Sequence, residues 1–357
     1  MQHDAELAAW IKLSLVPGLG SQSLRKLLAA FGLPQQVLAA GRGALARIVS
    51  IEIAARILSD FDSAAVNAAL EWAAADGHAV LTLADGDYPQ PLLETPDPPA
   101  LLYLRGRSEL LARPCLAVVG SRNATPQGMS NAERFARTFS AAGLTIVSGL
   151  ALGIDAAAHR GGLDGVGSTI AVLGTGADIL YPQRNHDLGE RIAQEGLIVS
   201  EFALGTPPHG ANFPRRNRVI SGLARGCLVV EAALASGSLI TARLAAEQGR
   251  EVFAIPGSIH SPHVKGCHEL IKQGAKLVET AQDLLQELGM KGLGAPPAAA
   301  DPVVTGLLAH LGYDPCDIDA LCARSGLTAG AVSAMLLQLE LEGKVTSLPG
   351  GLYQRTS

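Results

Sequence analysis

The chain has 357 residues, 48% of them hydrophobic, and its 28 Lys and Arg against 33 Asp and Glu give a formal net charge of −5. This length predicts two or three domains, and the net charge excludes attraction of a polyanion by overall charge, although a local basic patch can still bind one. There is no apolar run of the roughly 18 to 20 residues that a membrane span needs, and the N-terminus lacks the order of a signal peptide. We expect a cytoplasmic protein without a membrane span.

The five cysteines are an odd number and widely spaced, which argues against a disulfide framework and for a reducing compartment. One cluster resembles metal ligands: His260, His263, Cys267 and His268. Because it lacks the paired spacing of a zinc site, we predict no metal and no other cofactor.

Residues 1–77 are alanine-rich and predict a helical domain. Within them, Leu15-Val16-Pro17-Gly18-Leu19-Gly20-Ser21 resembles a helix-hairpin-helix turn, which can present backbone N–H groups to a phosphate at the start of the next helix. The alternative is a plain helical hairpin, whose glycines only satisfy the turn. The shortage of basic residues nearby favours this alternative.

Residues 78–290 alternate short β-branched runs with segments of helical length. The expected strands are 116–120, 144–148, 169–173, 197–200, 228–230 and 252–255, and the expected helices include 131–142, 156–162 and 239–249. This alternation predicts an α/β domain with an extended Rossmann-like parallel sheet, covered by helices on both faces. The proline-bearing lead-in, residues 88–106, predicts an extended arm before the first core strand.

Residues 291–300 have the small-residue and proline content of a linker. Residues 301–357 predict a winged-helix domain, with helices at 317–324 and 328–342 and a wing at 343–353. The would-be recognition helix carries no Arg or Lys, which base and phosphate contacts normally require. We therefore expect its apolar face to contact protein, and we expect no sequence-specific recognition of duplex DNA.

Glycine-bearing loops follow the first three expected strands, at the carboxyl edge where open parallel sheets bind ligands. They are Gly120-Ser121-Arg122, Gly149-Leu150-Ala151-Leu152-Gly153 and Gly174-Thr175-Gly176. Glycines let backbone N–H groups approach an anion closely, and Arg122 could reach a phosphate at the first loop. Neither a GxGxxG fingerprint nor a GxxxxGK[ST] loop occurs, which disfavours a nicotinamide enzyme and an NTPase.

The run Phe213-Pro214-Arg215-Arg216-Asn217-Arg218 packs three guanidiniums into six residues. Each guanidinium fork can donate two parallel charge-assisted hydrogen bonds to a phosphate. We predict that this run is one wall of a phosphate track. One or more of its arginines could instead pair with Glu201 or Glu231, each of which follows an expected strand.

Two further pairs have two possible roles each. Ser236 and Ser238, which open an expected helix, could bind phosphate or simply cap that helix. Asp155 and His159, four residues apart on another expected helix, could form an acid–base pair or a cap with a helix-surface contact. No nucleophilic triad stands out in the sequence.

The order of these motifs resembles that of the DprA/Smf family of DNA-processing proteins. The similarity covers the central region almost end to end, and the flanking regions resemble the family's N-terminal sterile-alpha-motif-like helices and its optional winged helix. The matching runs begin at Gly120, Ser148, Gly174, Tyr181, Phe213, Pro256 and Gly266.

The resemblance implies a non-catalytic protein that binds single-stranded DNA, forms a homodimer and loads the RecA recombinase during natural transformation. The family often has lysine after its Tyr-Pro pair, whereas this chain reads Gln183-Arg184-Asn185, so Arg184 would take that place. Few aromatic residues near the site predict little base stacking and weak sequence preference. The expected DNA-binding residues are Gly120, Ser121, Arg122, Gly149, Leu150, Gly174, Gly176, Arg184, Arg215, Arg216, Asn217, Arg218, Ser236 and Ser238.

The main alternative is a nucleotide-processing phosphoribohydrolase of the lysine-decarboxylase-like (LOG) class, which shares a Rossmann-like core with glycine-rich anion loops. The usual signature of that class is a PGGxGTxxE run. The comparable segment here, Ser236-Gly237-Ser238-Leu239-Ile240-Thr241-Ala242, lacks both the glycine cluster and the glutamate. This difference counts against the enzyme.

Overall fold

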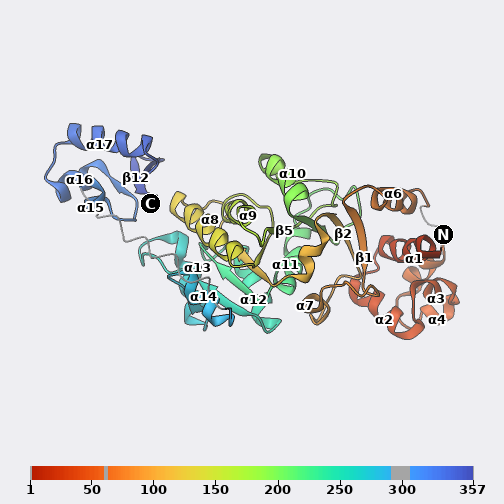
Figure 1. Cartoon of the computed structure of the whole chain (residues 1–357). Helices are drawn as coiled ribbons and strands as arrows, with labels where there is room; N and C mark the ends of the chain where they lie inside the picture. The colour runs from red at the N-terminus through yellow and green to blue at the C-terminus, as the bar shows by residue number, and fades with distance from the viewer. Residues whose placement is uncertain (1, 60–62, 291–305, 357) are drawn as a thin grey trace.

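The computed structural model describes residues 2–59, 63–290 and 306–356, and its centre is a mixed sheet (Figure 1). The strands lie in the order β1-β2-β6-β5-β4-β3-β7-β8-β9; neighbours from β6 to β9 are parallel, and β2 is antiparallel to both of its neighbours. The predicted Rossmann-like parallel sheet is confirmed. The strands are β1 (His78–Thr82), β2 (Leu101–Gly106), β3 (Cys115–Val119), β4 (Thr145–Ser148), β5 (Thr169–Val172), β6 (Leu197–Ser200), β7 (Gly226–Val229), β8 (Glu251–Ala254) and β9 (Lys276–Leu277).

The lead-in to the sheet is not the extended arm that the sequence predicted. Residues 90–93 form a short helix, α7 (Gln90–Leu93), and residues 101–106 form β2, which pairs with both β1 and β6. Along β2, Leu102 and Leu104 pack into the core of the sheet, while Leu101 and Tyr103 pack into the core of the N-terminal helices. Two apolar faces make β2 a buried strand, and they attach the N-terminal domain to the sheet.

Helices cover both faces of the sheet, as the alternating pattern predicts. On one face, α7, α11, α12 and α13 pack against the side chains of Ala117, Val119 and Val229. On the other face, α8, α9 and α14 pack against Leu116 and Val118, and α10 packs beside them. These helices are α8 (Pro126–Ala141), α9 (Ile154–Leu163), α10 (His186–Glu195), α11 (Asn212–Leu223), α12 (Ser238–Glu247), α13 (Lys265–Lys272) and α14 (Ala281–Glu287).

The N-terminal domain is helical, as expected, and its buried core is built around Ile11, Leu13, Leu27, Leu45 and Ile57. Its apolar helix faces close over this core because buried residues recur at helical spacing. The helices are α1 (Gln2–Leu15), α2 (Ser21–Phe31), α3 (Pro34–Ala39), α4 (Arg42–Leu45), α5 (Ile51–Leu58) and α6 (Ser63–Ala73).

The C-terminal region forms the predicted winged helix, which lies beside α8 at the end of the molecule away from the N-terminal helices (Figure 1). The Ser130 hydroxyl of α8 donates to the carbonyl of Thr356 at 3.2 Å. The outward face of the recognition helix is apolar, with Leu337 and Leu341 exposed. The elements are α15 (Leu307–Leu311), β10 (Cys316–Asp317), α16 (Ile318–Ser325), α17 (Ala329–Leu341), β11 (Val345–Leu348) and β12 (Leu352–Arg355).

The linker at 291–300 lies outside the described residues, and the domain boundaries stay predictions. All five cysteines are free, which confirms that they form no disulfide framework. In the part of the chain that the structure describes, no single helix is long and apolar enough to cross a membrane; α16 and α17 pass that test of length and composition only as a pair, bent by 107° at its break.

Candidate nucleic-acid interface

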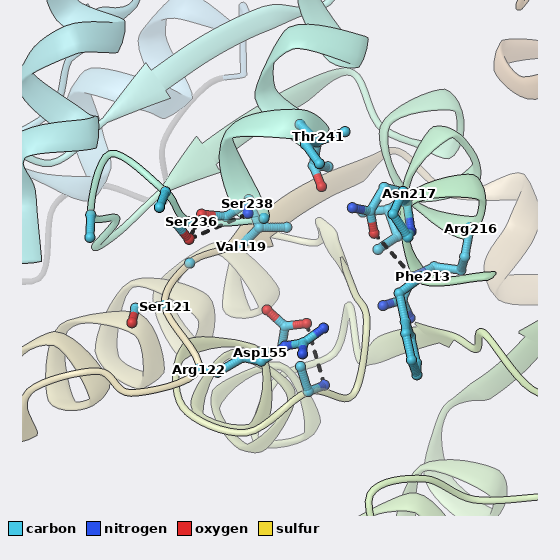
Figure 2. A pocket seen from close by; sticks show the side chains of 18 of the residues that line it. Val119, Ser121, Arg122, Asp155, Phe213, Arg216, Asn217, Ser236, Ser238 and Thr241 are labelled. Atoms are coloured by element: carbon cyan, nitrogen blue, oxygen red, sulfur yellow. Dashed lines mark hydrogen bonds between the residues drawn. The ribbon is translucent and has the colours of Figure 1, made fainter. Parts of the chain in front are cut away.

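A pocket of about 610 Å³ opens at the carboxyl ends of β3 and β7. The chain runs outward from β3 to β6 on one side and returns to β7 on the other, so this is the point of the sheet where ligands are expected. The loop after β3, the first turns of α11 and the loop into α12 surround the pocket (Figure 2). The predicted residues that line it are Gly120, Ser121, Arg122, Arg216, Asn217, Ser236 and Ser238.

The loop after β3 presents an exposed cation to this pocket. A Cβ on Gly120 would lie 2.5 Å from Ile154 and 2.8 Å from the carbonyl of Glu231, so only glycine fits there. The backbone N–H of Ser121 donates to that same carbonyl at 2.7 Å. The next residue, Arg122, is exposed, with its guanidinium 5.6 Å from the centre of the Phe213 ring and no carboxylate partner among the described residues. Its charge is therefore available to an anion.

The N-terminus of α8, where a Rossmann fold ordinarily binds pyrophosphate, is occupied by a carboxylate of the protein itself. The backbone N–H of Thr125, the residue that precedes α8, donates to Glu231 Oε2 at 2.9 Å. A Cβ on Gly128 would overlap this carboxylate. Burial raises the pKa of Glu231. Glu231 therefore accepts a backbone N–H at the position that a dinucleotide phosphate would need, and it pairs with no arginine of the run in the described part of the chain.

The glycine loop after β4 is satisfied internally. The N–H groups of Gly149 and Ala151 donate to Asp155 Oδ2 at 3.1 and 3.4 Å, and the N–H of Leu150 donates to His159 Nε2 at 3.2 Å. The Leu150 side chain is completely buried. Neither Gly149 nor Leu150 lines the pocket, and the N–H groups of this turn are already bonded within the protein, so their contact with DNA stays a prediction.

His159 is held as one neutral tautomer. Thr169 Oγ1 donates to the carbonyl of Ile146 at 2.7 Å, so it accepts the hydrogen bond of 2.7 Å from His159 Nδ1–H. Nε2 is then unprotonated and accepts from Leu150. Burial lowers the pKa of His159 to about 3 and raises that of Asp155. The sequence allowed Asp155 and His159 to be an acid–base pair or a structural pair. In the structure, both accept hydrogen bonds from the loop after β4, which is a structural role.

Arg216 also supports the loop from inside. Its side chain is buried, 4% exposed as a residue, and Nη1 donates to the carbonyl of Gly149 at 2.8 Å and to that of Val172. A Cβ on Gly149 would lie 2.5 Å from the guanidinium. Burial lowers the pKa of Arg216 to about 10, against the opposing charge of Asp155. The Arg216 guanidinium lines the pocket from its buried side, and its charge interacts with that of Asp155.

The other two arginines of the run lie on a different face of α11, a helix that the sequence analysis did not predict. Helical spacing turns Phe213, Arg216 and Asn217 toward the pocket, and it turns Arg215 and Arg218 away from it. Both of these pair with Glu201, Arg215 at 3.2 Å, and Arg218 also contacts Asp97 at 3.3 Å. The three arginines therefore do not form one continuous wall: Arg216 lines the pocket, and Arg215 and Arg218 lie outside it. The alternative that arginines of the run pair with Glu201 is present.

The third glycine loop and Arg184 lie outside the pocket. A Cβ on Gly174 would lie 2.8 Å from the Phe213 ring, and the N–H of Gly176 donates to the carbonyl of Thr206 at 3.0 Å. Close packing explains both glycines. Arg184 is exposed on the 3₁₀ turn η2 (Gln183–Asn185), and its role in DNA binding stays a prediction.

Sequence reasoning missed the aromatic residues at this site. Phe213 lines the pocket, with its ring 5.9 Å from that of Tyr181, which is 45% exposed. A low aromatic content says nothing about where the few aromatic residues lie. The signal that could have found Phe213 is its place at the head of the arginine run.

Ser236 and Ser238 meet at the start of α12, on the side of the pocket opposite α11 (Figure 2). Their hydroxyls are 2.7 Å apart, and the N–H of Ser238 donates to Ser236 Oγ at 3.4 Å. Gly237 is the N-cap residue, so neither hydroxyl caps the helix in the usual position. Phosphate binding by the two hydroxyls remains a prediction.

The remaining sequence motifs have structural partners. The hydroxyl of Ser21, at the start of α2, donates to Asp97 at 2.9 Å, as a plain helical hairpin allows. In the cluster that resembles metal ligands, Cys267 is buried, and His268 Nε2 lies 3.0 Å from the carbonyl of Gly257. Within residues 2–59, 63–290 and 306–356, no group of three His, Cys, Asp or Glu side chains could hold a metal ion.

Comparison with known proteins decides the family. Residues 79–289 match the family model described as DNA recombination-mediator protein A, and residues 291–351 match the DprA winged helix domain. The chain belongs to the DNA recombination-mediator protein A family. A member of similar length, Protein Smf of Escherichia coli (strain K12), is 41% identical over 315 residues, which cover 85% of this chain and 84% of that protein.

Two solved structures of DprA proteins share the fold. The X-ray structure of DNA processing protein A from Streptococcus pneumoniae is 40% identical, with a TM-score of 0.69, over 78% of this chain and 95% of that one. The protein from Helicobacter pylori, studied for its single-stranded DNA binding mode, is 32% identical, with a TM-score of 0.54, over 59% of this chain and 95% of that one. The resemblance to the DprA/Smf family is confirmed.

Proposed function

We propose that this DprA-family chain binds single-stranded DNA through phosphate contacts at the pocket beyond β3 and β7, and loads the RecA recombinase on incoming DNA in natural transformation. The observation that carries the proposal is Arg122, an exposed guanidinium beside the pocket without a carboxylate partner in the described residues. The other charges of the pocket, on Asp155 and Arg216, face one another. The single-stranded DNA binding of the Helicobacter pylori relative supports the same ligand.

The surroundings of Arg122 favour a strand of DNA over a mononucleotide. Glu231 fills the position at the N-terminus of α8 that a nucleotide phosphate would take. Phe213 lies beside Arg122, Tyr181 lies beside Phe213, and the exposed Arg184 follows Tyr181 three residues later in the chain. Cations and aromatic faces distributed along one edge suit successive phosphates and bases of a single strand.

The proposal includes no catalytic step. Asp155 and His159, the acid–base pair considered from the sequence, are committed to the N–H groups of the loop after β4. The neutral His159 is also fully buried, out of reach of a substrate. We place the protein in the cytoplasm, where its five free thiols would stay reduced.

We include a homodimer in the proposal and place its contact at the β9 edge of the sheet. Within the described residues this edge has no neighbouring strand, and unpaired edges are ready sites of association. Beside it lies an apolar groove lined by Leu234, Ile259 and Leu277, which are 65%, 68% and 47% exposed. Exposed apolar side chains gathered in one groove are typical of a protein–protein contact.

The test compares binding of labelled single-stranded and duplex oligonucleotides over a salt series, by fluorescence anisotropy. The logarithm of the association constant for the single strand should fall linearly with the logarithm of the salt concentration. Arg122→Ala should weaken binding by about 1.5–3 kcal/mol, the worth of a charge-assisted hydrogen bond, and should reduce the salt slope by about 0.7.

The matched control is Arg113→Ala, which removes the same charge just before β3, at the opposite edge of the sheet. It should leave single-strand affinity unchanged. Unchanged affinity in Arg122→Ala, or an equal loss in both variants, would reject this site.

A further inference from the structure

A second cleft, of about 860 Å³, lies at the same edge of the sheet, between α8 and the winged helix. Asn123 lines both this cleft and the pocket described above, so the two hollows adjoin. The central domain contributes the first turns of α8 and the loops after β7 and β8. The winged helix, which Figure 1 shows beside α8, contributes Tyr313 and its wing.

The cleft is rich in side-chain amides, from Asn123, Gln127, Asn131 and Gln354. Gln127 Nε2 donates to Asn131 Oδ1 at 2.9 Å, and Gln354 Nε2 donates to the carbonyl of Tyr313 at 3.0 Å. A carbonyl can only accept, so the Gln354 amide is oriented with its nitrogen toward Tyr313. The oxygen of that amide therefore faces away from Tyr313.

Two of these amide oxygens lack a donor. Gln127 Oε1 and Gln354 Oε1 are buried and accept no hydrogen bond from the described part of the protein, and Gln354 is only 4% exposed. A buried acceptor without a donor destabilises the arrangement that contains it. Both side chains line the cleft, so N–H donors are what a ligand between the wing and α8 would add to it.

The charges around the cleft suit a base better than a row of phosphates. Glu231 and Asp314 line the cleft, and the one guanidinium among its lining residues, Arg134, is exposed. Amide side chains pair bidentately with the donor and acceptor edge of a nucleobase, as Asn and Gln do with adenine. The cleft thus combines neutral base-reading groups with a single cation for the backbone.

We propose that this cleft is a second subsite for the DNA strand, in which α8 and the wing hold a nucleobase by its hydrogen-bonding edge. The strand passes from Arg122 and Phe213 across Asn123 into the cleft. The winged helix then contributes to binding through its wing rather than through its uncharged recognition helix. This inference rests on the proposed single-strand binding and adds a base contact to it.

The test is a length series of single-stranded oligodeoxyadenylates with the full chain. In the wild type, affinity should rise as the oligonucleotide grows long enough to reach the second subsite. Asn131→Ala and Gln354→Ala should leave binding of the shortest oligonucleotides unchanged and weaken binding of the longer ones by about five- to 150-fold, the range of one bidentate base contact. Because Gln354 is buried, thermal unfolding of both variants is measured alongside, and the half-buried Asn131 carries the test if Gln354→Ala does not fold.

A single abasic position, moved along a long oligonucleotide, gives the decisive readout. In the wild type, the abasic substitution should lower affinity at one position beyond the first subsite. In Asn131→Ala, the abasic substitution at that position should cause no further loss, because the base and the Asn131 side chain form the same contact. Additive losses would overturn the subsite. Tighter binding of long oligonucleotides by the variants would also overturn it, since the wing would then cover the path of the strand. Both results would leave the short-oligonucleotide binding and its loss in Arg122→Ala intact, so they separate this inference from the proposed function.

Discussion

Two glycine loops at the same edge of the sheet differ in whether their polar groups are bonded within the protein. The loop after β3 exposes Arg122 to the pocket, whereas the loop after β4 has its N–H groups bonded to Asp155 and His159 and a carbonyl bonded to Arg216. Both loops show the same pattern of an apolar strand followed by glycine. The difference is that internal groups saturate the loop after β4, whereas the loop after β3 carries a charge without a carboxylate partner among the described residues.

Glycine at the end of a strand indicates that another group packs closely against the backbone there, but it does not indicate which group. After β4 the approaching groups are the protein's own buried side chains, and Gly149 leaves room for the Arg216 guanidinium. After β3 the close contacts, with Ile154 and Glu231, only shape the turn. An anion-binding loop is therefore one whose polar groups remain unsatisfied by the fold.

The largest expected effect separates the two loops by stability. Arg216→Met removes a buried guanidinium and leaves the Asp155 charge and the carbonyls of Gly149 and Val172 without their partner, so it should cost about 3–5 kcal/mol of unfolding free energy. Urea unfolding measures this. Arg122→Met, the matched change at the exposed position, should stay within about 0.5 kcal/mol of the wild type. Equal stabilities of the two variants would contradict the contrast drawn between the loops.

The second expected effect is a pH dependence that belongs to the saturated loop. The folded pKa of His159, about 3, is below the value of about 6.5 in an unfolded chain. Between these two pH values, His159 is protonated in the unfolded state and neutral in the folded state. The contribution of His159 to the free energy of unfolding is therefore fully present above pH 6.5 and falls as the pH drops, by up to about 1.4 kcal/mol per pH unit.

His159→Gln can still accept from the N–H of Leu150 and cannot titrate in this range. It should lose less stability than the wild type between about pH 6.5 and pH 4, measured by urea unfolding at each pH. Asp155 and Glu231 are present in both proteins, so the difference between the curves isolates His159. Parallel curves would mean that His159 is not held neutral.

The smallest expected effect concerns the two faces of α11. Arg215 is 48% exposed and already paired with Glu201, so a phosphate that approaches it must compete with that carboxylate. Arg215→Ala should weaken single-strand binding by only about 0.2–1 kcal/mol, the worth of an exposed ion pair, and by less than Arg122→Ala. A loss as large as that of Arg122→Ala would move the DNA path to the outer face of α11.

Much of this protein was determined by local sequence patterns. Apolar β-branched runs placed β3 to β8 within a residue or two, and helix-turn-helix spacing placed α16 and α17. The order of short motifs identified the family. The antiparallel strand β2 was mistaken for an arm because its prolines precede the strand, and its two apolar faces depend on distant partners.

Tertiary structure alone decided which polar groups of the site are free. Glu231 accepts from the N–H of Thr125, the residue before α8, across 106 residues of the chain, and Arg216 reaches Gly149 across 67 residues. No local pattern encodes such contacts, because they form only when separate βα units assemble on one sheet. The sequence therefore determined the fold class, the family and the edge of the sheet, and packing decided that Arg122, rather than the arginine run as a whole, presents its charge to the pocket.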